Sequence, residues 1–264
     1  MVRVRSGQGL GDALYLRAVA ERMAREQETI ALTDFPDVFL GSAVKTEPFT
    51  RLAPHTIAAH YTASMDNQDS TQYADMVRTA GLRDVPLRFT WNVRNAKVVT
   101  ELAERADGRP IILVHGGCVA MQRKDNFSAD MLPRREAFVA ALDALNGDCY
   151  CVGIGKAARL YELPLDEDLH GMTTVSDLLD IAVSCTGILA QCSFCVPLAE
   201  VFDKPLLAVW AARGLTSSNS YIRGVTPAKV LSKPSSTFLM DDWSPERIAD
   251  AARRLLSPEV ACAS

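Results

Sequence analysis

A glycine-rich turn between the first predicted strand and the first predicted helix constrains the fold of this chain more than any other stretch. The alternating run 2–5 is typical of a strand, and good helix formers extend from the turn to about Gln27. Glycines at positions 7, 9 and 11 allow positive φ angles and a close approach of the backbone to a ligand. A strand, a glycine turn and a helix in this order predict the first unit of a parallel α/β sheet.

Asp12 closes this turn and has two possible roles. The start of a helix offers unpaired N–H groups and a positive dipole end, but a carboxylate placed there would repel a phosphate. As the helix N-cap, Asp12 accepts backbone N–H bonds. As a general base at the mouth of a cleft, it takes a proton from an acceptor hydroxyl. Residue type and spacing do not decide between the two roles.

Bulk properties predict a globular chain of one large or two small domains. The chain has 264 residues, 48% of them hydrophobic, and a formal net charge of −4, which argues against a broad nucleic-acid surface. Its apolar runs are shorter than the ~20 residues that span a bilayer. We expect no signal peptide before the first strand, because glycines and Asp12 interrupt the would-be apolar region. The seven cysteines are then reduced thiols, and the expected location is cytoplasmic.

Strands and helices alternate in both halves of the chain, which predicts two α/β units with parallel sheets. The Asp-Gly-Arg-Pro sequence at 107–110 breaks the pattern and gives domains at 1–108 and 109–243, followed by a last helix at 244–264 that begins at Ser244. A polar loop at 62–71 is a candidate lid. The expected strands are 2–5, 28–33, 45–49, 55–61, 111–114, 149–152, 187–190 and 205–210, and the expected helices include 72–82, 94–106, 132–146 and 193–202.

Three loops of the second half follow strands, so they gather at the carboxyl edge of its sheet, where ligands of open α/β sheets bind. Glycines, lysines and a helix start at one edge favour a diphosphate site, although each short motif alone is more often a tight turn with a solvated side chain. His115, before the first loop, is more often a hydrogen-bonded core histidine than a catalytic one. The candidate residues are Gly116 and Gly117 with Arg123 and Lys124, then Gly153, Gly155 and Lys156, and finally Gln191 and Ser193.

Cys192 and Cys195 have the Cys-x-x-Cys spacing of thiol-redox motifs at a strand-to-helix junction. There the helix dipole lowers the pKa of the first thiol. Pro197 and the late position in the chain match such motifs poorly, so redox chemistry is a minor hypothesis. His55, His60 and His170 have no metal-ligand spacing with acidic residues or cysteines, and we expect neither a metal site nor a cofactor.

Several of these motifs together resemble the family 9 glycosyltransferases, the lipopolysaccharide heptosyltransferases. The Gly-Leu-Gly-Asp-Ala-Leu turn at 9–14 is similar to the N-terminal Gly-Asp turn of that family. The segment 168–210 looks like its C-terminal signature, with a Leu-x-Gly-x-Thr stretch at 169–173 and Leu-Ala-Glu-Val-Phe-Asp-Lys-Pro at 198–205. The strand at 111–117 is similar to the opening strand of its nucleotide domain.

The resemblance implies a GT-B fold, in which two Rossmann-like domains with parallel sheets face each other across a cleft. The second domain then holds a nucleotide-diphosphate sugar, and the first holds the acceptor at the turn of Gly9 and Gly11. Asp12 becomes the base of an inverting, metal-independent transfer. Arg123 or Lys124 contacts the donor phosphates, Met172 and Thr173 lie near the nucleotide base, and the helix from Ser244 crosses back towards the first domain.

One departure from the family motivates a second hypothesis. The family loop that receives the diphosphate, Asp-Ser/Thr-Gly-x-x-His, corresponds to 192–197, where only Ser193 is kept. The protein is therefore expected to be a glycosyltransferase or, alternatively, a catalytically silent relative that binds a nucleotide or sugar. The acceptor is left open among a glycan, a small molecule and a modified DNA base, as are the sugar, the nucleotide and the oligomeric state.

Overall fold

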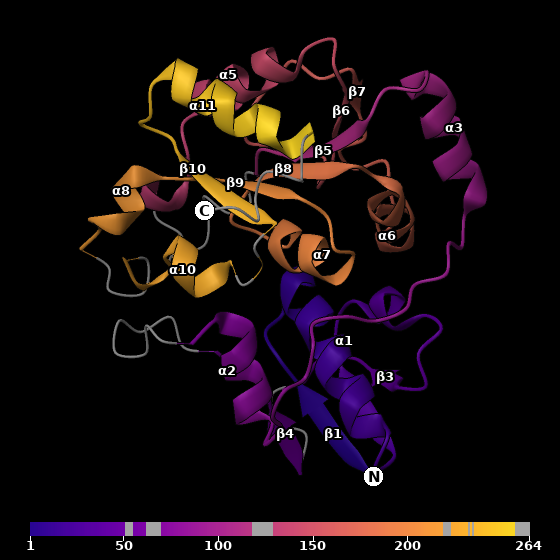
Figure 1. Cartoon of the computed structure of the whole chain (residues 1–264). Coiled ribbons are helices and arrows are strands. Elements are labelled where there is room, and N and C mark those ends of the chain that lie inside the picture. Colours follow the sequence, from indigo (N-terminus) through magenta and orange to yellow (C-terminus); the bar gives the residue numbers. More distant parts are fainter. Residues whose placement is uncertain are drawn as a thin grey trace.

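The computed structural model describes residues 1–50, 55–61, 70–117, 129–218, 223–231, 233 and 235–256, and it contains two separate parallel sheets (Figure 1). The first sheet consists of β1 (Val2–Arg5), β2 (Thr29–Leu32), β3 (Lys45–Glu47) and β4 (Thr56–Ala58). Its helical elements are α1 (Leu10–Ala24), η1 (Pro36–Phe39) and α2 (Gln72–Thr79). The candidate lid at 62–71 lies almost wholly outside the described residues.

The first sheet has the strand order β3-β2-β1-β4, with every neighbouring pair parallel. β1 lies inside the sheet, so its alternating sequence places Val4 in the core. β3 lies at the edge of the sheet, where the proline that follows it interrupts no ladder. The four strands and the first helix expected in this half are confirmed. α1 is buried over 13–20 because it packs against β2, α2 and a helix of the second domain.

The second sheet contains β5 (Ile111–His115), β6 (Tyr150–Gly153), β7 (Glu167–Asp168), β8 (Gly187–Gln191), β9 (Leu206–Trp210) and β10 (Ser236–Met240). Its order is β10-β9-β8-β5-β6-β7, again parallel throughout. β5, β8 and β9 are buried on both faces, which explains their continuous apolar sequences. The helical elements are α3 (Ala96–Ala106), η2 (Ala129–Met131), α5 (Arg135–Leu145), α6 (Val175–Ser184), α7 (Cys195–Val201), α8 (Ala212–Leu215), α10 (Pro227–Val230), α11 (Pro245–Arg253) and η3 (Arg254–Leu256).

Helices cover both faces of the second sheet, and one face looks towards the first domain. α5 and α11 pack on the outer face over Ile112, Val114 and Leu189. α6 and α7 lie on the inner face, between this sheet and α1 (Figure 1). The core on the inner face is continuous with the core of the first domain, so Leu113 and Leu14 belong to one apolar cluster. The two domains therefore share buried apolar surface.

α11 differs from the expected last helix that crosses back to the first domain. Its N-cap is Ser244, as predicted, but Ile248 and Ala252 pack into the outer core beside α5. Its apolar face is therefore covered by the second domain. Residues 257–264 lie outside the described residues.

α3 also packs on the second domain, although it precedes the boundary proposed at 108. It contacts α6, and Arg105 forms an ion pair of 2.8 Å with Glu167 of β7. Leu102 and Ala106 supply its buried face. Because α3 contacts the second domain, the chain crosses from the first domain to the second in the segment that precedes α3.

That crossing segment is held at both ends by buried side chains. On the first-domain side, the buried Arg17 donates to the carbonyl of Thr90 at 2.9 Å, and its guanidinium lies 4.0 Å from the ring centroid of Phe89. On the second-domain side, the indole N–H of Trp91 donates to the buried Asp180 at 2.7 Å. A charged group with satisfied hydrogen bonds fixes geometry, since moving it leaves a charge buried without partners.

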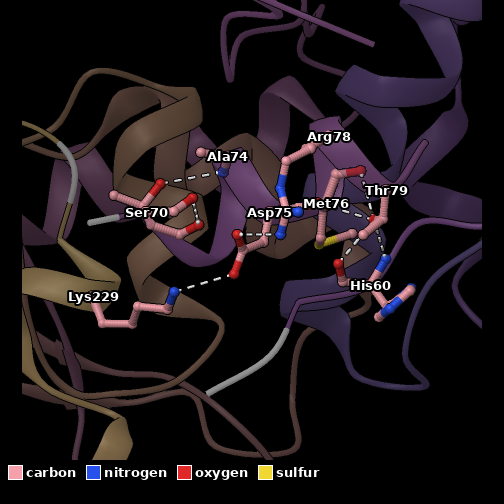
Figure 2. A network of polar contacts seen from close by, with 9 residues as sticks. His60, Ser70, Ala74, Asp75, Met76, Arg78, Thr79 and Lys229 are labelled. Atoms are coloured by element: carbon pink, nitrogen blue, oxygen red, sulfur yellow. Dashed lines mark hydrogen bonds and ion pairs between the residues drawn. The ribbon is translucent and has the colours of Figure 1, made fainter. Parts of the chain in front are cut away.

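An ion pair between Asp75 of α2 and Lys229 of α10 joins the domains at a second place (Figure 2). Lys229 Nζ lies 3.1 Å from Asp75 Oδ2, and the side chains are only 3% and 1% exposed. Arg78 approaches the other carboxylate oxygen at 3.1 Å, from a side chain that is 66% exposed. Figure 2 shows Lys229 reaching across to α2 from the opposite side to Arg78.

Among the helices of the described residues, none combines the length and the apolar character that a membrane span requires.

Lys229→Met tests this buried pair. The substitution leaves the Asp75 carboxylate buried without its main cationic partner, so we expect the free energy of unfolding in urea to fall by about 3 kcal/mol. The matched control is Lys97→Met, because Lys97 is 81% exposed in its ion pair with Glu101. The control should change stability by no more than about 0.5 kcal/mol. Equal effects of the two substitutions would contradict the account.

Candidate active site

A cavity of about 580 Å³ lies between the two domains, at the carboxyl ends of strands from both sheets. Segments that follow β1, β2 and β4 form its wall on the first domain, and segments that follow β5, β6 and β8 form much of the opposite wall. This is where open parallel sheets bind ligands. The lining includes Gln8, Gly9, Leu10, Gly11, Asp12, Tyr15, Phe35, Tyr61 and Gln72 on the first side, and His115, Gly155, Lys156, Thr173, Thr174, Val175, Ser193, Phe194, Val196, Pro197, Val225 and Val230 on the second.

Asp12 lines the cavity and also caps α1, but it is not the N-cap. Gly9 is the N-cap, and Asp12 stands three residues further on, where its Oδ2 accepts the Gly9 N–H at 3.0 Å. The hydroxyl of Ser6 donates to the Asp12 carbonyl at 3.1 Å. The two roles considered from the sequence are therefore compatible, because a capping carboxylate in this position stays half-buried at the cavity surface.

The glycines of this turn provide space rather than a left-handed backbone. None of the three has a positive φ, contrary to the sequence expectation. A Cβ at Gly7 would lie 2.3 Å from Asp12 Oδ2, and one at Gly9 would lie 3.0 Å from it. A Cβ at Gly11 would lie 3.2 Å from the Cα of Phe194 in the loop that opens α7. The absence of side chains at Gly7 and Gly9 lets the Asp12 carboxylate approach the backbone of the turn. The absence of a side chain at Gly11 lets the two domains come into contact.

The wall formed by the second domain offers groups that suit an anion. Thr174 caps α6, and Thr173, Thr174 and Val175 line the cavity at the positive end of that helix. Ser193 lines it in the loop before α7. Lys156 is the one Lys or Arg among the described lining residues. Gly155 carries a φ of 128°, which favours glycine, and so keeps the loop that bears Lys156 close to His115.

His115, at the end of β5, is a neutral and buried member of this wall. Its Nδ1 lies 3.2 Å from the Ser193 hydroxyl, and its ring packs edge-on against Phe194 at 4.9 Å. Burial, and after it the nearby His170, lowers the pKa of His115 from 6.5 to about 3. The expectation of a hydrogen-bonded core histidine is confirmed, but this histidine also faces the cavity.

The predicted site residues divide into two groups. Those that line the cavity are Gly9, Gly11, Asp12, Gly155, Lys156, Thr173 and Ser193. Those outside its lining are Gly116, Gly117, Gly153, Gln191 and Met172. Gly116 packs against Leu163, Gly117 against Gln191, and Gly153 against Leu165. Gln191 is buried at the end of β8, whereas Met172 is 73% exposed. Arg123 and Lys124 lie outside the described residues.

Sequence reasoning missed the aromatic part of the cavity. Phe35 and Tyr61 each follow a strand of the first sheet, and Tyr15 stands one turn after Asp12 on α1. The signal was available, since residues just after parallel strands gather at one edge. Val225 and Val230 of the second domain are close to them only through tertiary packing.

The cysteine pair does not have the environment of a redox motif. Burial raises the pKa of Cys192 to about 12 and that of Cys195 also to about 12, whereas thiol-redox chemistry needs a lowered first pKa. The five described cysteines are free thiols. Among the described residues, no group of three or more His, Cys, Asp and Glu side chains is arranged to hold a metal ion.

Comparison with known proteins gives a fold but no relative by sequence. No family model and no curated protein matches the chain. A family 9 glycosyl transferase from Veillonella parvula superposes with a TM-score of 0.63 at 12% identity, over 97% of each chain. Heptosyltransferase II of E. coli, an ADP-heptose enzyme, gives 0.58 at 12% identity over 98% of this chain and 100% of its own.

A third solved structure agrees with these two. The dodecameric iron-containing glycosyltransferase TibC of E. coli gives a TM-score of 0.58 at 14% identity, over 98% of this chain and 74% of its own. Together with the two facing parallel sheets, these matches decide the architecture. The chain has the GT-B fold. The expected fold class is confirmed, and in this GT-B chain the cavity lies in the cleft between the domains.

The pKa of His115 predicts a pH dependence of stability. Between pH 6.5 and about 3, the unfolded chain binds a proton at this residue and the folded chain does not. The contribution of the neutral His115 to the free energy of unfolding is therefore fully present above pH 6.5. It is lost as the pH falls, by about 1.4 kcal/mol per pH unit. The measurement is urea unfolding at pH 7, 6 and 5. His115→Gln should lower the dependence of the free energy of unfolding on pH by the amount that corresponds to the uptake of one proton on unfolding. An unchanged slope would show that His115 is not held neutral by burial.

Proposed function

We propose that this protein is an inverting glycosyltransferase that moves a sugar from a nucleotide-diphosphate donor to a hydroxyl acceptor without a metal ion. The observation that carries the proposal is the position of Asp12, whose carboxylate lines the interdomain cavity opposite the anion-binding groups of the second domain. The fold supports it, because the superposed proteins are named glycosyltransferases and one of them acts on ADP-heptose.

The donor diphosphate is assigned to the second domain. The N-terminus of α6, the Ser193 hydroxyl and Lys156 together offer a dipole, a hydrogen-bond donor and a positive charge. His115 Nδ1 lies 3.2 Å from the Ser193 hydroxyl and holds it in place. Because the ring is neutral, it brings no positive charge that competes with the hydroxyl. Arg123 and Lys124 are proposed as further phosphate contacts. These groups stabilise the negative charge that develops on the departing diphosphate.

The acceptor side is assigned to the first turn of α1. The acceptor hydroxyl gives its proton to the Asp12 carboxylate, and its oxygen forms a bond to the anomeric carbon of the sugar. The bond from that carbon to the diphosphate oxygen breaks at the same time, and the diphosphate leaves on the opposite face. A single displacement of this kind inverts the configuration of the sugar.

A catalytically silent nucleotide-binding protein is the second candidate, and the loop before α7 is the observation that favours it. The family motif at 192–197 has an Asp and a His that are replaced here by Cys192 and Pro197. The Ser193 hydroxyl also accepts the N–H of Cys195 at 3.3 Å, which occupies one amide of the helix start. Binding without turnover would support this candidate.

Asp12→Asn separates the base from the cap. Its amide oxygen still accepts the Gly9 N–H, so the free energy of unfolding should fall by less than about 1 kcal/mol. Asparagine cannot take a proton, so turnover should fall by about 10²–10⁴-fold. The assay is release of nucleoside diphosphate from a panel of sugar nucleotides.

The matched control is Asp177→Asn. Asp177 holds the equivalent third position of α6, where its carboxylate accepts the Thr174 N–H at 3.1 Å, but it does not line the cavity. This substitution should lower stability by a similar amount and leave turnover within a few-fold of the wild type. If Asp12→Asn kept wild-type turnover, Asp12 would be a cap alone. If sugar nucleotides bound to the wild type without turnover, the silent candidate would replace the enzyme.

A further inference from the structure

The wall of the cavity on the first domain is aromatic. Phe35 follows β2 and Tyr61 follows β4, and both line the cavity together with Tyr15 of α1, the helix that also carries Asp12. Tyr15 is 4% exposed, and its ring stacks on Tyr73 with 5.4 Å between centroids, so the surface it presents is fixed. Burial, with Glu200 and Tyr61 nearby, raises the pKa of Tyr15 well above its usual value and keeps it a neutral phenol.

Apolar side chains continue this surface around the acceptor position. Leu10 comes from the first turn of α1, Pro197 and Val196 from the start of α7, and Val225 and Val230 from the segment around α10. The ion pair of Lys229 with Asp75 fixes α10 against α2, next to this wall. Rings and aliphatic groups from both domains therefore line the cavity that Asp12 faces.

The charges on this side argue against an anionic acceptor. Among its described lining residues Asp12 is the one charged side chain, and it is negative. A phosphate or carboxylate on the acceptor is normally recognised by Arg or Lys. Lys156, the described cation of the cavity, belongs to the wall assigned to the donor. An anionic acceptor would therefore face repulsion from Asp12 with no described cation beside it.

The polar groups on this side are too few for a free sugar or a glycan. A polyhydroxylated acceptor needs a hydrogen-bond partner for each buried hydroxyl, because a buried hydroxyl without a partner weakens binding. Besides Asp12, the described side chains that can provide partners here are Gln8, Gln72 and the two tyrosines. Flat rings packing on aromatic side chains gain both buried area and ring-pair energy.

We propose, resting on the transferase function above, that the acceptor is an uncharged aromatic alcohol or phenol. Its ring lies against Phe35, Tyr15 and Tyr61, and its hydroxyl reaches Asp12. The hydroxyl proton passes to the Asp12 carboxylate, the oxygen bonds to the anomeric carbon, and the nucleoside diphosphate leaves as the bond from that carbon to the phosphate oxygen breaks. The product is an aryl or arylmethyl glycoside of inverted configuration.

The first experiment measures acceptor preference with any sugar nucleotide that the wild type hydrolyses. The acceptors are 2-naphthylmethanol, glucose 6-phosphate, maltose and an oligonucleotide that carries 5-hydroxymethyluracil. We expect kcat/KM for 2-naphthylmethanol to exceed the other three by at least about 100-fold, with the glycoside identified by mass. A higher value for the phosphorylated sugar, the glycan or the oligonucleotide overturns the inference while leaving the transferase function intact.

The second experiment tests the aromatic wall itself. Phe35→Ala should raise KM for 2-naphthylmethanol by about 10-fold, which corresponds to the loss of one ring contact. The matched control is Phe238→Ala, because Phe238 is 40% exposed on β10 and does not line the cavity. An unchanged KM in Phe35→Ala overturns the inference.

A binding measurement without donor makes the two proposals separable. Fluorescence titration of 2-naphthylmethanol should show binding to the wild type that weakens about 10-fold in Phe35→Ala and not in Phe238→Ala. If the aryl alcohol binds in this way but no sugar nucleotide is turned over, the transferase function fails and the aromatic subsite stands. If sugar nucleotides are turned over but the aryl alcohol does not bind, the inference alone fails.

Discussion

The contact between Gly11 and the loop that opens α7 is the constraint on which the rest of this structure depends. A Cβ at Gly11 would lie 3.2 Å from the Cα of Phe194 and 3.4 Å from Pro197 Cγ, so the two domains meet through bare backbone. Because both segments follow parallel strands, the contact brings the ligand-binding edges of the two sheets together. Asp12, one residue further on, is thereby placed at the cavity between them.

The cleft is held by buried charged groups as well as by this apolar contact. Asp180 accepts from Trp91 and from two backbone N–H groups of the crossing segment, and Lys229 is paired with Asp75 across the domains. Separating the domains would expose their shared apolar core and break the buried ion pair of Lys229 with Asp75. These contacts hold the two walls of the cavity in a fixed relation to each other. A site of this kind suits chemistry in which a fixed carboxylate and fixed helix dipoles stabilise a transition state without reorganising.

Sequence reasoning predicted the fold well and the site partly, for physical reasons that differ by residue. Segment 111–114 was recognisable because a strand buried on both faces must be apolar throughout. β10 was missed because its Ser-Thr start reads as polar and it lies at a sheet edge. The turn at Asp12 was located correctly. Its glycines are needed because a side chain there would collide with the Asp12 carboxylate or with Phe194, and the contact with Phe194 depends on tertiary packing. Phe35 and Tyr61 follow parallel strands, so their place at this edge could have been predicted, whereas Val230 joins the same cavity only through tertiary packing, which no local pattern encodes.

A crystal structure with an intact sugar nucleotide bound tests the central claim most directly, namely that the second domain holds the donor and Asp12 faces the reacting carbon. The account predicts the diphosphate at Ser193, Lys156 and the start of α6. It also predicts the anomeric carbon directed across the cleft, with room for one acceptor oxygen between it and the Asp12 carboxylate. A diphosphate bound instead at the Gly7–Gly11 turn, or a sugar directed away from Asp12, would contradict the account.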